Sequence, residues 1–317
     1  MNVFISLDTF SNTSELPKQL LENAAIKIDI NQHGRTMKSS ELAQEIQGAT
    51  ALIAGTERIT EDVFKNAPKL KLISRVGIGL DGIDFELCEK YGVSVTYTPD
   101  APTIAVAELC VAMILDLARE MTIANNNLKS NKWYRHMGML LYGKTIGIIG
   151  MGRIGKSLVH LLDAFNVNFL AYDIAPDVVF GRLKKVTFVS KEEILKNSDI
   201  VSIHIPLSSQ TKDFIRFEDM KSMKKTAMLI NTARGGIVNE KDLYTALKQG
   251  EISGAAVDVF EEEPYYGNLT TLDNCLLTSH MGASTVESRT DMEVQAVEEV
   301  IRFYNGLPLK NEVSGYK

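Results

Sequence analysis

Short apolar runs alternate with amphipathic stretches over the first hundred residues. Residues 15–23 have the spacing of an amphipathic helix, and further helical segments separate the later apolar runs. The apolar runs predict four strands, at residues 3–7, 25–30, 50–54 and 70–74. Alternation of strands and helices favours a parallel sheet covered by helices. The first hundred residues therefore predict a small α/β domain.

The same alternation returns after a long helical stretch. Pro99 and Pro102 interrupt the first pattern, and residues 103–130 then predict a helix that we interpret as a crossover between domains. A second α/β series covers about residues 144–278, and a helix over about residues 285–305 follows it. Turns within that series are predicted at Gly150, Pro206 and Gly235. The 317 residues are about twice the usual size of one domain, so we expect two.

Composition and charge exclude several classes of protein. The chain is 45% hydrophobic and 23% charged, as in an ordinary globular enzyme. Its net charge of -6 argues against a nucleic-acid binder, which needs a basic face, although local cations could still bind a small anion. The sequence contains neither a membrane-spanning apolar run nor the basic and apolar segments of a signal peptide. We therefore expect a cytoplasmic protein without membrane or nucleic-acid partners.

Cysteine and histidine positions give no sign of a metal site. The three cysteines are scattered without metal-ligand spacing, and free cysteine usually fills core positions. They are Cys88, Cys110 and Cys275. Three histidines lie outside any motif, and we interpret them as structural: His33, His136 and His160. We expect no bound metal.

The most informative local segment is a glycine motif between two predicted strands. Residues 144–155 read Lys-Thr-Ile-Gly-Ile-Ile-Gly-Met-Gly-Arg-Ile-Gly, so Gly150, Gly152 and Gly155 have the G-x-G-x-x-G spacing. A helix is predicted over residues 156–165 and a strand over residues 167–172, directly before Asp173. Strand, glycine motif, helix, strand and acidic residue in this order are typical of a dinucleotide-binding fold. A lone glycine triplet could be only a flexible turn.

Each residue of the motif has a physical role in binding a dinucleotide. Gly150 permits a tight turn, Gly152 lets the backbone approach a pyrophosphate, and Gly155 lets the helix pack against the strand. The helix N-terminus offers N–H groups and positive dipole to the phosphates. The Asp173 carboxylate would accept hydrogen bonds from ribose hydroxyls and would repel a 2′-phosphate. The segment therefore predicts NAD as the cofactor, in preference to NADP.

Five further motifs follow one another in an order that resembles a known family. Residues 75–84 read Arg-Val-Gly-Ile-Gly-Leu-Asp-Gly-Ile-Asp, and residues 204–207 read His-Ile-Pro-Leu. Residues 231–236 read Asn-Thr-Ala-Arg-Gly-Gly, 257–264 read Val-Asp-Val-Phe-Glu-Glu-Glu-Pro, and 279–285 read Ser-His-Met-Gly-Ala-Ser-Thr. Together with the glycine motif, they resemble the D-isomer-specific 2-hydroxyacid dehydrogenases over nearly the whole chain. Within that family the chain is most similar to the phosphoglycerate dehydrogenases.

The resemblance implies a catalytic set of His280, Glu263 and Arg234. His280 would be the general acid/base, because hydride transfer at a ketone carbon leaves negative charge on oxygen that a nearby proton donor must neutralise. Glu263 would orient the imidazole and favour its protonated form. Arg234 would bind the substrate carboxylate and polarise the carbonyl with its planar guanidinium. Taken alone, Arg234 could be a surface ion-pair former, and the acidic residues 261–263 could be a solvated loop.

The resemblance also implies cofactor and substrate contacts. Asp258 would hold the nicotinamide carboxamide, and residues 204–206 would line the adenine. The full cofactor set is Gly150, Gly152, Arg153, Ile154, Gly155, Asp173, His204, Ile205, Pro206, Thr211, Thr232, Ala233, Asp258, His280 and Gly282. The substrate set is Arg75, Val76, Gly77 and Ile78, together with Arg234 and His280. Gly77 and Ile78 would offer backbone N–H groups to the substrate carboxylate, although this loop could also be a purely structural turn.

Departures from the family pattern concern the substrate. Ile78 and Gly82 replace commoner polar residues, and Gly55 lies near where phosphoglycerate dehydrogenases often place a phosphate-binding arginine. Any of three arginines could supply the missing charge, or each could be an ordinary surface residue: Arg58, Arg75 and Arg135. We expect 3-phosphoglycerate and 3-phosphohydroxypyruvate as the substrate pair. Glyoxylate or hydroxypyruvate reduction is the alternative, and a sugar-acid derivative is a third.

The implied architecture is α/β, with two Rossmann-like domains. Residues 1–100 and 285–317 would form a flavodoxin-like substrate domain, and residues 101–284 a doubly wound NAD-binding domain, with the active site in a cleft between them. A homodimer built around the helix at residues 103–130 is expected. No appended amino-acid-binding regulatory domain is expected. A function of another class also fits the motifs, because a corepressor branch that senses NAD(H) shares this fold.

Overall fold

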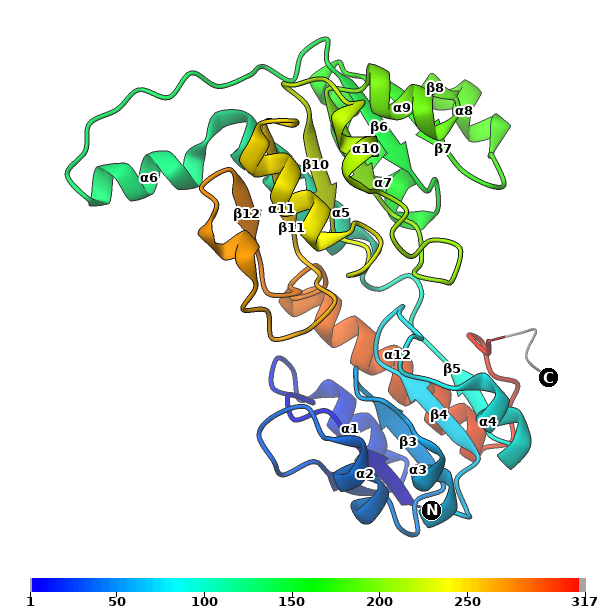
Figure 1. Cartoon of the computed structure of the whole chain (residues 1–317). Helices are drawn as coiled ribbons and strands as arrows, with labels where there is room; N and C mark the ends of the chain where they lie inside the picture. Colours follow the sequence, from blue (N-terminus) through cyan, green and yellow to red (C-terminus); the bar gives the residue numbers. More distant parts are fainter. Residues whose placement is uncertain (1, 314–317) are drawn as a thin grey trace. The chain divides into compact units, whose positions relative to one another are not determined.

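The computed structural model describes residues 2–313, which divide into two compact units (Figure 1). The first unit contains the residues up to Pro102 and those from Ala283 onward, and the second is Thr103–Gly282. Each unit has its own sheet, and every strand pair in both sheets is parallel. The α/β class with two parallel, Rossmann-like sheets, predicted from the sequence, is confirmed.

The first unit has a five-stranded sheet in the order β2-β1-β3-β4-β5. This is the flavodoxin-like strand order, in which the chain changes direction between β1 and β3. The strands are β1 (Asn2–Ile5), β2 (Lys27–Ile30), β3 (Ala51–Ala54), β4 (Leu72–Arg75) and β5 (Ser94–Thr96). The helices are α1 (Leu16–Asn23), α2 (Ser39–Glu45), α3 (Glu61–Asn66), α4 (Phe85–Tyr91) and α12 (Val286–Tyr304).

Alternation along the strands covers both faces of this sheet. Leu52 packs in a cluster with residues of α2 and α3, whereas its neighbour Ile53 packs with Val297 and other residues of α12. Successive side chains of a strand point to opposite faces, so a continuous apolar run such as β3 requires helices on both sides. The helix α12 therefore completes the core of the first unit.

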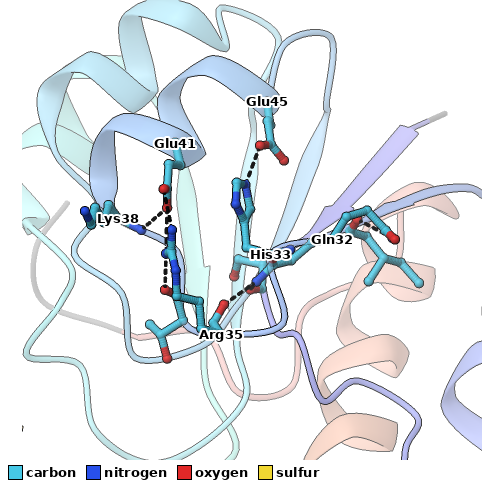
Figure 2. Close-up of polar contacts among 10 residues, drawn as sticks. Gln32, His33, Arg35, Lys38, Glu41 and Glu45 are labelled. Atoms are coloured by element: carbon cyan, nitrogen blue, oxygen red, sulfur yellow. Dashed lines mark hydrogen bonds and ion pairs between the residues drawn. The ribbon is translucent and has the colours of Figure 1, made fainter. Parts of the chain in front are cut away.

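A surface loop between β2 and α2 is held by ion pairs (Figure 2). The Arg35 guanidinium donates to both carboxylate oxygens of Glu41, at 2.9 and 2.6 Å, and this hydrogen bonding lowers the pKa of Glu41 to about 2. His33 Nε2 lies 2.6 Å from Glu45 Oε1, and the His33 backbone N–H donates to Asn31 Oδ1. His33 thus contributes to the structure of this loop.

The second unit has a seven-stranded sheet in the order β12-β11-β10-β9-β6-β7-β8. Its chain direction reverses between β6 and β9, as in the Rossmann order, with one further strand at the edge. The strands are β6 (Thr145–Ile149), β7 (Asn168–Tyr172), β8 (Val186–Phe188), β9 (Ile200–Ile203), β10 (Met228–Asn231), β11 (Gly254–Val257) and β12 (Cys275–Leu277). The helices are α5 (Thr103–Arg119), α6 (Met121–Lys129), α7 (Arg153–Leu162), α8 (Val178–Lys184), α9 (Lys191–Asn197), α10 (Phe217–Lys221) and α11 (Glu240–Gln249).

The prediction of a single helix over residues 103–130 is wrong, because the helix is interrupted at Glu120. Glu120 has φ 51°, in the left-handed region, and divides the stretch into α5 and α6. The Ala118 carbonyl accepts from Met139 N at 2.7 Å, and the Thr122 N–H donates to Asp116 Oδ1, so the helical hydrogen-bond ladder is interrupted. α6 and the segment after it extend away from the sheet of their unit (Figure 1).

The three cysteines fill core positions, as predicted. Burial raises the pKa of Cys88 and Cys275 to about 12 and that of Cys110 to about 11, so none is a ready nucleophile. Within residues 2–313, no group of three His, Cys, Asp or Glu side chains is placed to hold a metal ion. No helix in the described part of the chain has the length and apolar character needed to cross a bilayer.

Candidate active site

A histidine–carboxylate pair lies at the carboxyl end of the second sheet. His280 follows β12, Glu263 follows β11, and the two strands are neighbours. His280 Nδ1 lies 2.8 Å from Glu263 Oε2 and 3.0 Å from Oε1. Both side chains are about 40% exposed, and His280 Nε2 makes no hydrogen bond to any residue in the described part of the chain. Glu263 thus orients the ring through Nδ1, and Nε2 is left for a small molecule to bind.

Glu263 is held in its ionised form. Partial burial alone would raise the pKa of its carboxyl, but the hydrogen bond and charge of His280 oppose this effect. The Phe260 N–H, which donates to Glu263 Oε1 at 3.1 Å, and the nearby Arg234 charge add to that opposition. The pKa of Glu263 is consequently below its ordinary value. An ionised Glu263 accepts a hydrogen bond from the Nδ1–H of His280 and so orients the ring.

The buried Asp258 fixes the backbone that carries His280. Its Oδ1 accepts from Met281 N at 2.8 Å and from Thr278 Oγ1 at 2.5 Å, and its Oδ2 accepts from Gly282 N at 2.9 Å. His280 itself has φ 51°, an unusual value for a residue with a side chain. Asp258 therefore positions the loop that carries His280. The nicotinamide contact expected of it stays a prediction.

Arg234 lies on a turn that packs against the segment carrying Glu263. Asn231 Nδ2 donates to the Arg234 carbonyl at 3.0 Å, and Arg234 Nη1 donates to the Ala233 carbonyl at 2.6 Å. A Cβ on Gly235 would lie 2.0 Å from the Phe260 carbonyl group, so only glycine allows this approach. The structure thus brings the three predicted catalytic side chains together in one unit.

The glycine loop has the shape that an NAD pyrophosphate requires. Gly150 has φ +98°, and a Cβ there would lie 2.6 Å from the His204 carbonyl oxygen. A Cβ on Gly155 would lie 2.3 Å from the Gly150 carbonyl oxygen, so the helix packs directly on the turn. Gly152, by contrast, faces open space at the start of α7. Backbone N–H groups there are available to phosphate oxygens.

The acidic residue of the motif closes this loop. Asp173 Oδ2 accepts from Met151 N at 2.7 Å, and Oδ1 accepts from Ala175 N at 2.8 Å. Asp173 is half-buried, beside the turn of the glycine loop. Of the other predicted cofactor residues here, Arg153 is exposed at the first position of α7, and Ile154 is half-buried against the core.

Buried polar side chains, which the sequence analysis did not predict, lie next to residues 204–206 of the predicted cofactor set. His204 Nε2 lies 2.8 Å from Ser202 Oγ, and Cys110 Sγ lies 3.1 Å from Thr232 Oγ1. His204 Nδ1 is buried and makes no hydrogen bond to the described residues. Burial lowers the pKa of His204 to about 4, so the ring is neutral. The one sign of this contact in the sequence is Ser202, a polar residue within the apolar strand β9.

The turn after this motif is closed by its own side chains. Thr211 Oγ1 donates to the Pro206 carbonyl at 2.6 Å and accepts from Ser208 N at 2.7 Å. Ile205 lies against the glycine loop, since its Cγ2 would be 2.9 Å from a Cβ on Gly150. His204, Ile205 and Pro206 therefore border the same loop as the glycine motif.

Four of the predicted substrate residues, Arg75 to Ile78, lie at the end of β4 and directly after it in the first unit. Val76 is buried, and its N–H donates to the Ala54 carbonyl at 2.9 Å. The Gly77 N–H donates to Thr98 Oγ1 at 2.8 Å, so this structure does not offer it to a substrate as expected. The Ile78 N–H makes no hydrogen bond to the described residues. Arg75 folds back on the loop, where its Nη1 would lie 2.9 Å from a Cβ on Gly77.

Comparison with known proteins assigns the family. A sequence profile described as the NAD binding domain of D-isomer specific 2-hydroxyacid dehydrogenase matches residues 111–282, more than half of the chain. The chain belongs to the D-isomer specific 2-hydroxyacid dehydrogenase family. The family resemblance and the NAD cofactor, both expected from the sequence, are confirmed.

Similar relatives within the D-isomer specific 2-hydroxyacid dehydrogenase family include D-3-phosphoglycerate dehydrogenases and glyoxylate reductases. The D-3-phosphoglycerate dehydrogenase of Methanocaldococcus jannaschii is 40% identical over 284 residues, which cover 88% of this chain and 54% of that protein. The glyoxylate reductase of Pyrococcus furiosus is 37% identical over 291 residues, which cover 88% of this chain and 87% of that protein. The TT0316 protein of Thermus thermophilus matches with a TM-score of 0.91 and 30% identity, over 99% of this chain and 100% of that one. The chain thus spans about half the length of the phosphoglycerate dehydrogenases it matches.

Replacing Asp173 with alanine should relax the preference for NAD over NADP. The carboxylate borders the glycine loop, where it would repel a 2′-phosphate, so its loss should raise the NADPH-to-NADH ratio of kcat/KM by about tenfold or more. Asp177→Ala is the matched control, because Asp177 pairs with Lys156 at 2.6 Å and caps α8. A ratio that stays the same in Asp173→Ala would mean that another residue selects the cofactor.

The free energy of unfolding should fall as the pH drops from about 6.5 to about 4 because of His204. The unfolded chain takes up a proton near the ordinary histidine pKa of 6.5, whereas the buried ring resists protonation down to about 4. Folded protein is therefore destabilised across that window by about 3 kcal/mol and no further below it. Urea unfolding of the wild type and His204→Gln at several pH values tests this. Parallel pH curves for the two proteins would contradict it.

Proposed function

We propose that the chain catalyses the NAD-dependent interconversion of a small 2-hydroxy acid and the corresponding 2-oxo acid. The observation that carries this proposal is the pair of His280 and Glu263, in which Nδ1 is bound to the carboxylate at 2.8 Å and the His280 side chain is 41% exposed. NAD, when bound, supplies or accepts the hydride at carbon 2 of the substrate. The side chains of the protein supply the proton and the orientation.

Each catalytic side chain has a separate task in this proposal. His280 Nε2 gives a proton to the substrate oxygen during reduction and removes it during oxidation. Glu263 stabilises the imidazolium and holds the ring through Nδ1. Arg234, whose charge reaches Glu263, binds the substrate carboxylate with its guanidinium fork. Asp258 keeps the His280 backbone in place during these steps.

The similar relatives have different names and so do not indicate a single substrate. The sequence favours 3-phosphoglycerate first and glyoxylate or hydroxypyruvate second, and relatives of both names are similar to this chain. The decisive experiment is the rate of NADH oxidation with 3-phosphohydroxypyruvate, hydroxypyruvate and glyoxylate. Turnover of any of these acids supports the proposed reaction. Tight NADH binding without turnover of any 2-oxo acid would instead indicate an NAD(H)-sensing, corepressor-like protein.

We also propose that the chain forms a homodimer through the segment after α6. This segment, residues 131–142, is rich in exposed apolar side chains, which water does not favour. Trp133 is 80% exposed, Met137 91% and Leu140 74%. Sedimentation should give a dimer mass for the wild type and a monomer mass for Met137→Asp combined with Leu140→Asp. Val179→Asp, on the exposed face of α8, is the control and should stay dimeric.

A further inference from the structure

A buried carboxylate lies at the carboxyl edge of the first sheet. Glu57, three residues beyond β3, is only 6% exposed. Its side chain turns back toward the sheet, where Ser6 Oγ donates to Oε1 and the Gly55 N–H donates to the same oxygen at 3.1 Å. The Gly55 N–H also lies 3.2 Å from Ser6 Oγ. Groups that follow β1 and β3 thus converge on one acidic side chain.

This carboxylate lies at the place where a sheet of this topology binds ligands. In open parallel sheets, ligands bind beyond the carboxyl ends of the strands, where the strand order reverses. That reversal falls between β1 and β3 here, and Ser6 and Gly55 are the residues directly after those strands. Glu57 accepts the donors at this point, so an anion arriving there meets a negative charge in place of free N–H and O–H groups.

The glycine at position 55 is explained by the same carboxylate. A Cβ on Gly55 would lie 2.8 Å from Glu57 Oε2 and 3.4 Å from Leu7 Cγ. Any side chain at position 55 would therefore require the Glu57 carboxylate to move from this orientation. Gly55 thus leaves the space that the Glu57 carboxylate occupies.

The carboxylate adjoins the predicted substrate loop. The Ile59 N–H donates to the Gly82 carbonyl at 2.9 Å, and a Cβ on Gly82 would lie 2.6 Å from the Glu57 carbonyl oxygen. The segment after β3 and the loop after β4 are therefore packed together. Two cations lie near in sequence: Arg58 is exposed, and Arg75 folds back on its own loop. A buried charge is screened less by solvent and salt than an exposed one, so Glu57 should affect a nearby anion more strongly than the exposed Arg58 does.

We infer that Glu57 is a specificity-determining residue that excludes phosphorylated 2-oxo acids and restricts the reaction to small, unphosphorylated ones. This rests on the proposed dehydrogenase function and on binding of the acid beside residues 76–83. A phosphate group carries nearly two negative charges at neutral pH, so one fixed charge nearby weakens its binding substantially. A substrate without that group, such as hydroxypyruvate or glyoxylate, escapes the repulsion.

The test compares kcat/KM for hydroxypyruvate and 3-phosphohydroxypyruvate with NADH, using the full chain. The wild type should favour hydroxypyruvate, a result that needs no variant. Glu57→Gln keeps the shape and removes the charge, and it should raise the relative kcat/KM for the phosphorylated acid by about tenfold, mainly through KM. Glu57→Asp keeps the charge and should retain the wild-type preference.

Glu22→Gln is the matched control, because it removes an exposed carboxylate near the end of α1, before β2 begins. It should leave the substrate ratio unchanged. NADH binding and the unfolding temperature establish that each variant is folded. A wild-type preference for 3-phosphohydroxypyruvate, or an unchanged ratio in folded Glu57→Gln, would overturn the inference while the proposed function stands. Absence of turnover with either acid and with glyoxylate would overturn both.

Discussion

Replacing His280 with alanine should lower kcat by about 10²- to 10⁴-fold while the Kd for NADH changes little. His280 Nε2 is the proton donor in the proposed reaction, and the alanine variant offers no group that could replace it. The glycine loop that would hold the cofactor pyrophosphate is built from Gly150 to Gly155, well removed along the chain. Single-turnover kinetics with a 2-oxo acid and NADH fluorescence titration measure the two quantities separately.

Two further variants show whether the loss comes from proton transfer. Glu263→Gln keeps a hydrogen-bond acceptor for Nδ1 but removes the charge, so it should lower kcat less than His280→Ala and change the pH profile of kcat. His160→Ala is the control on α7, where the ring packs edge-on to Phe180. Equal losses of NADH affinity and turnover in His280→Ala would refute its role as acid/base.

Among glycine-to-alanine substitutions in the active-site region, Gly235→Ala should lower the free energy of unfolding the most. The added Cβ would lie 2.0 Å from both the carbonyl carbon and oxygen of Phe260 and 2.4 Å from Glu261 N. Backbone atoms cannot move aside as a flexible side chain can, so the cost should be about 3 kcal/mol or more. The turn carrying Arg234 would shift away from Glu263, and kcat/KM should fall together with the unfolding temperature.

Gly152→Ala separates the stability effect from the effect on binding. A Cβ at Gly152 meets no atom within 4 Å, so the unfolding temperature should be close to that of the wild type. The same methyl group would occupy the approach to the pyrophosphate, so the KM for NADH should rise. Circular-dichroism melting and steady-state kinetics on both glycine variants distinguish the two outcomes. Equal melting temperatures for Gly235→Ala and the wild type would show that the turn relaxes freely.

Local patterns made most of the second unit predictable. The apolar run before Gly150 and the glycine spacing depend on neighbours within a few positions, and both appear in the structure as a buried strand followed by a tight turn. α7 nevertheless begins at Arg153, three residues earlier than predicted, because the helix starts directly after the last residue of the turn. The pairing of His280 and Glu263 was predicted from the family motifs that contain them. The hydrophobic periodicity of the two segments gives no indication of it.

Features that depend on distant contacts could not be predicted. The break at Glu120 requires Met139 to reach the Ala118 carbonyl, and no residue around position 120 is a helix breaker. The Cys110–Thr232 contact joins residues 122 positions apart, and the Ser6–Glu57 contact joins residues 51 positions apart. An acidic residue soon after an apolar strand usually lies in a solvated turn. Only the fold shows that Glu57 is buried.

The position of α12 affects the order in which the two units can form during synthesis. Residues of β1, β3 and β4, including Ile5, Ile53 and Leu72, share a core cluster with Val297 and Val300 of this helix. A ribosome makes those strands first and the helix roughly 200 residues later, whereas all residues of the second unit emerge without interruption. The nascent first unit therefore keeps an uncovered apolar sheet face until α12 has been made, and the later-made unit can fold before the earlier one.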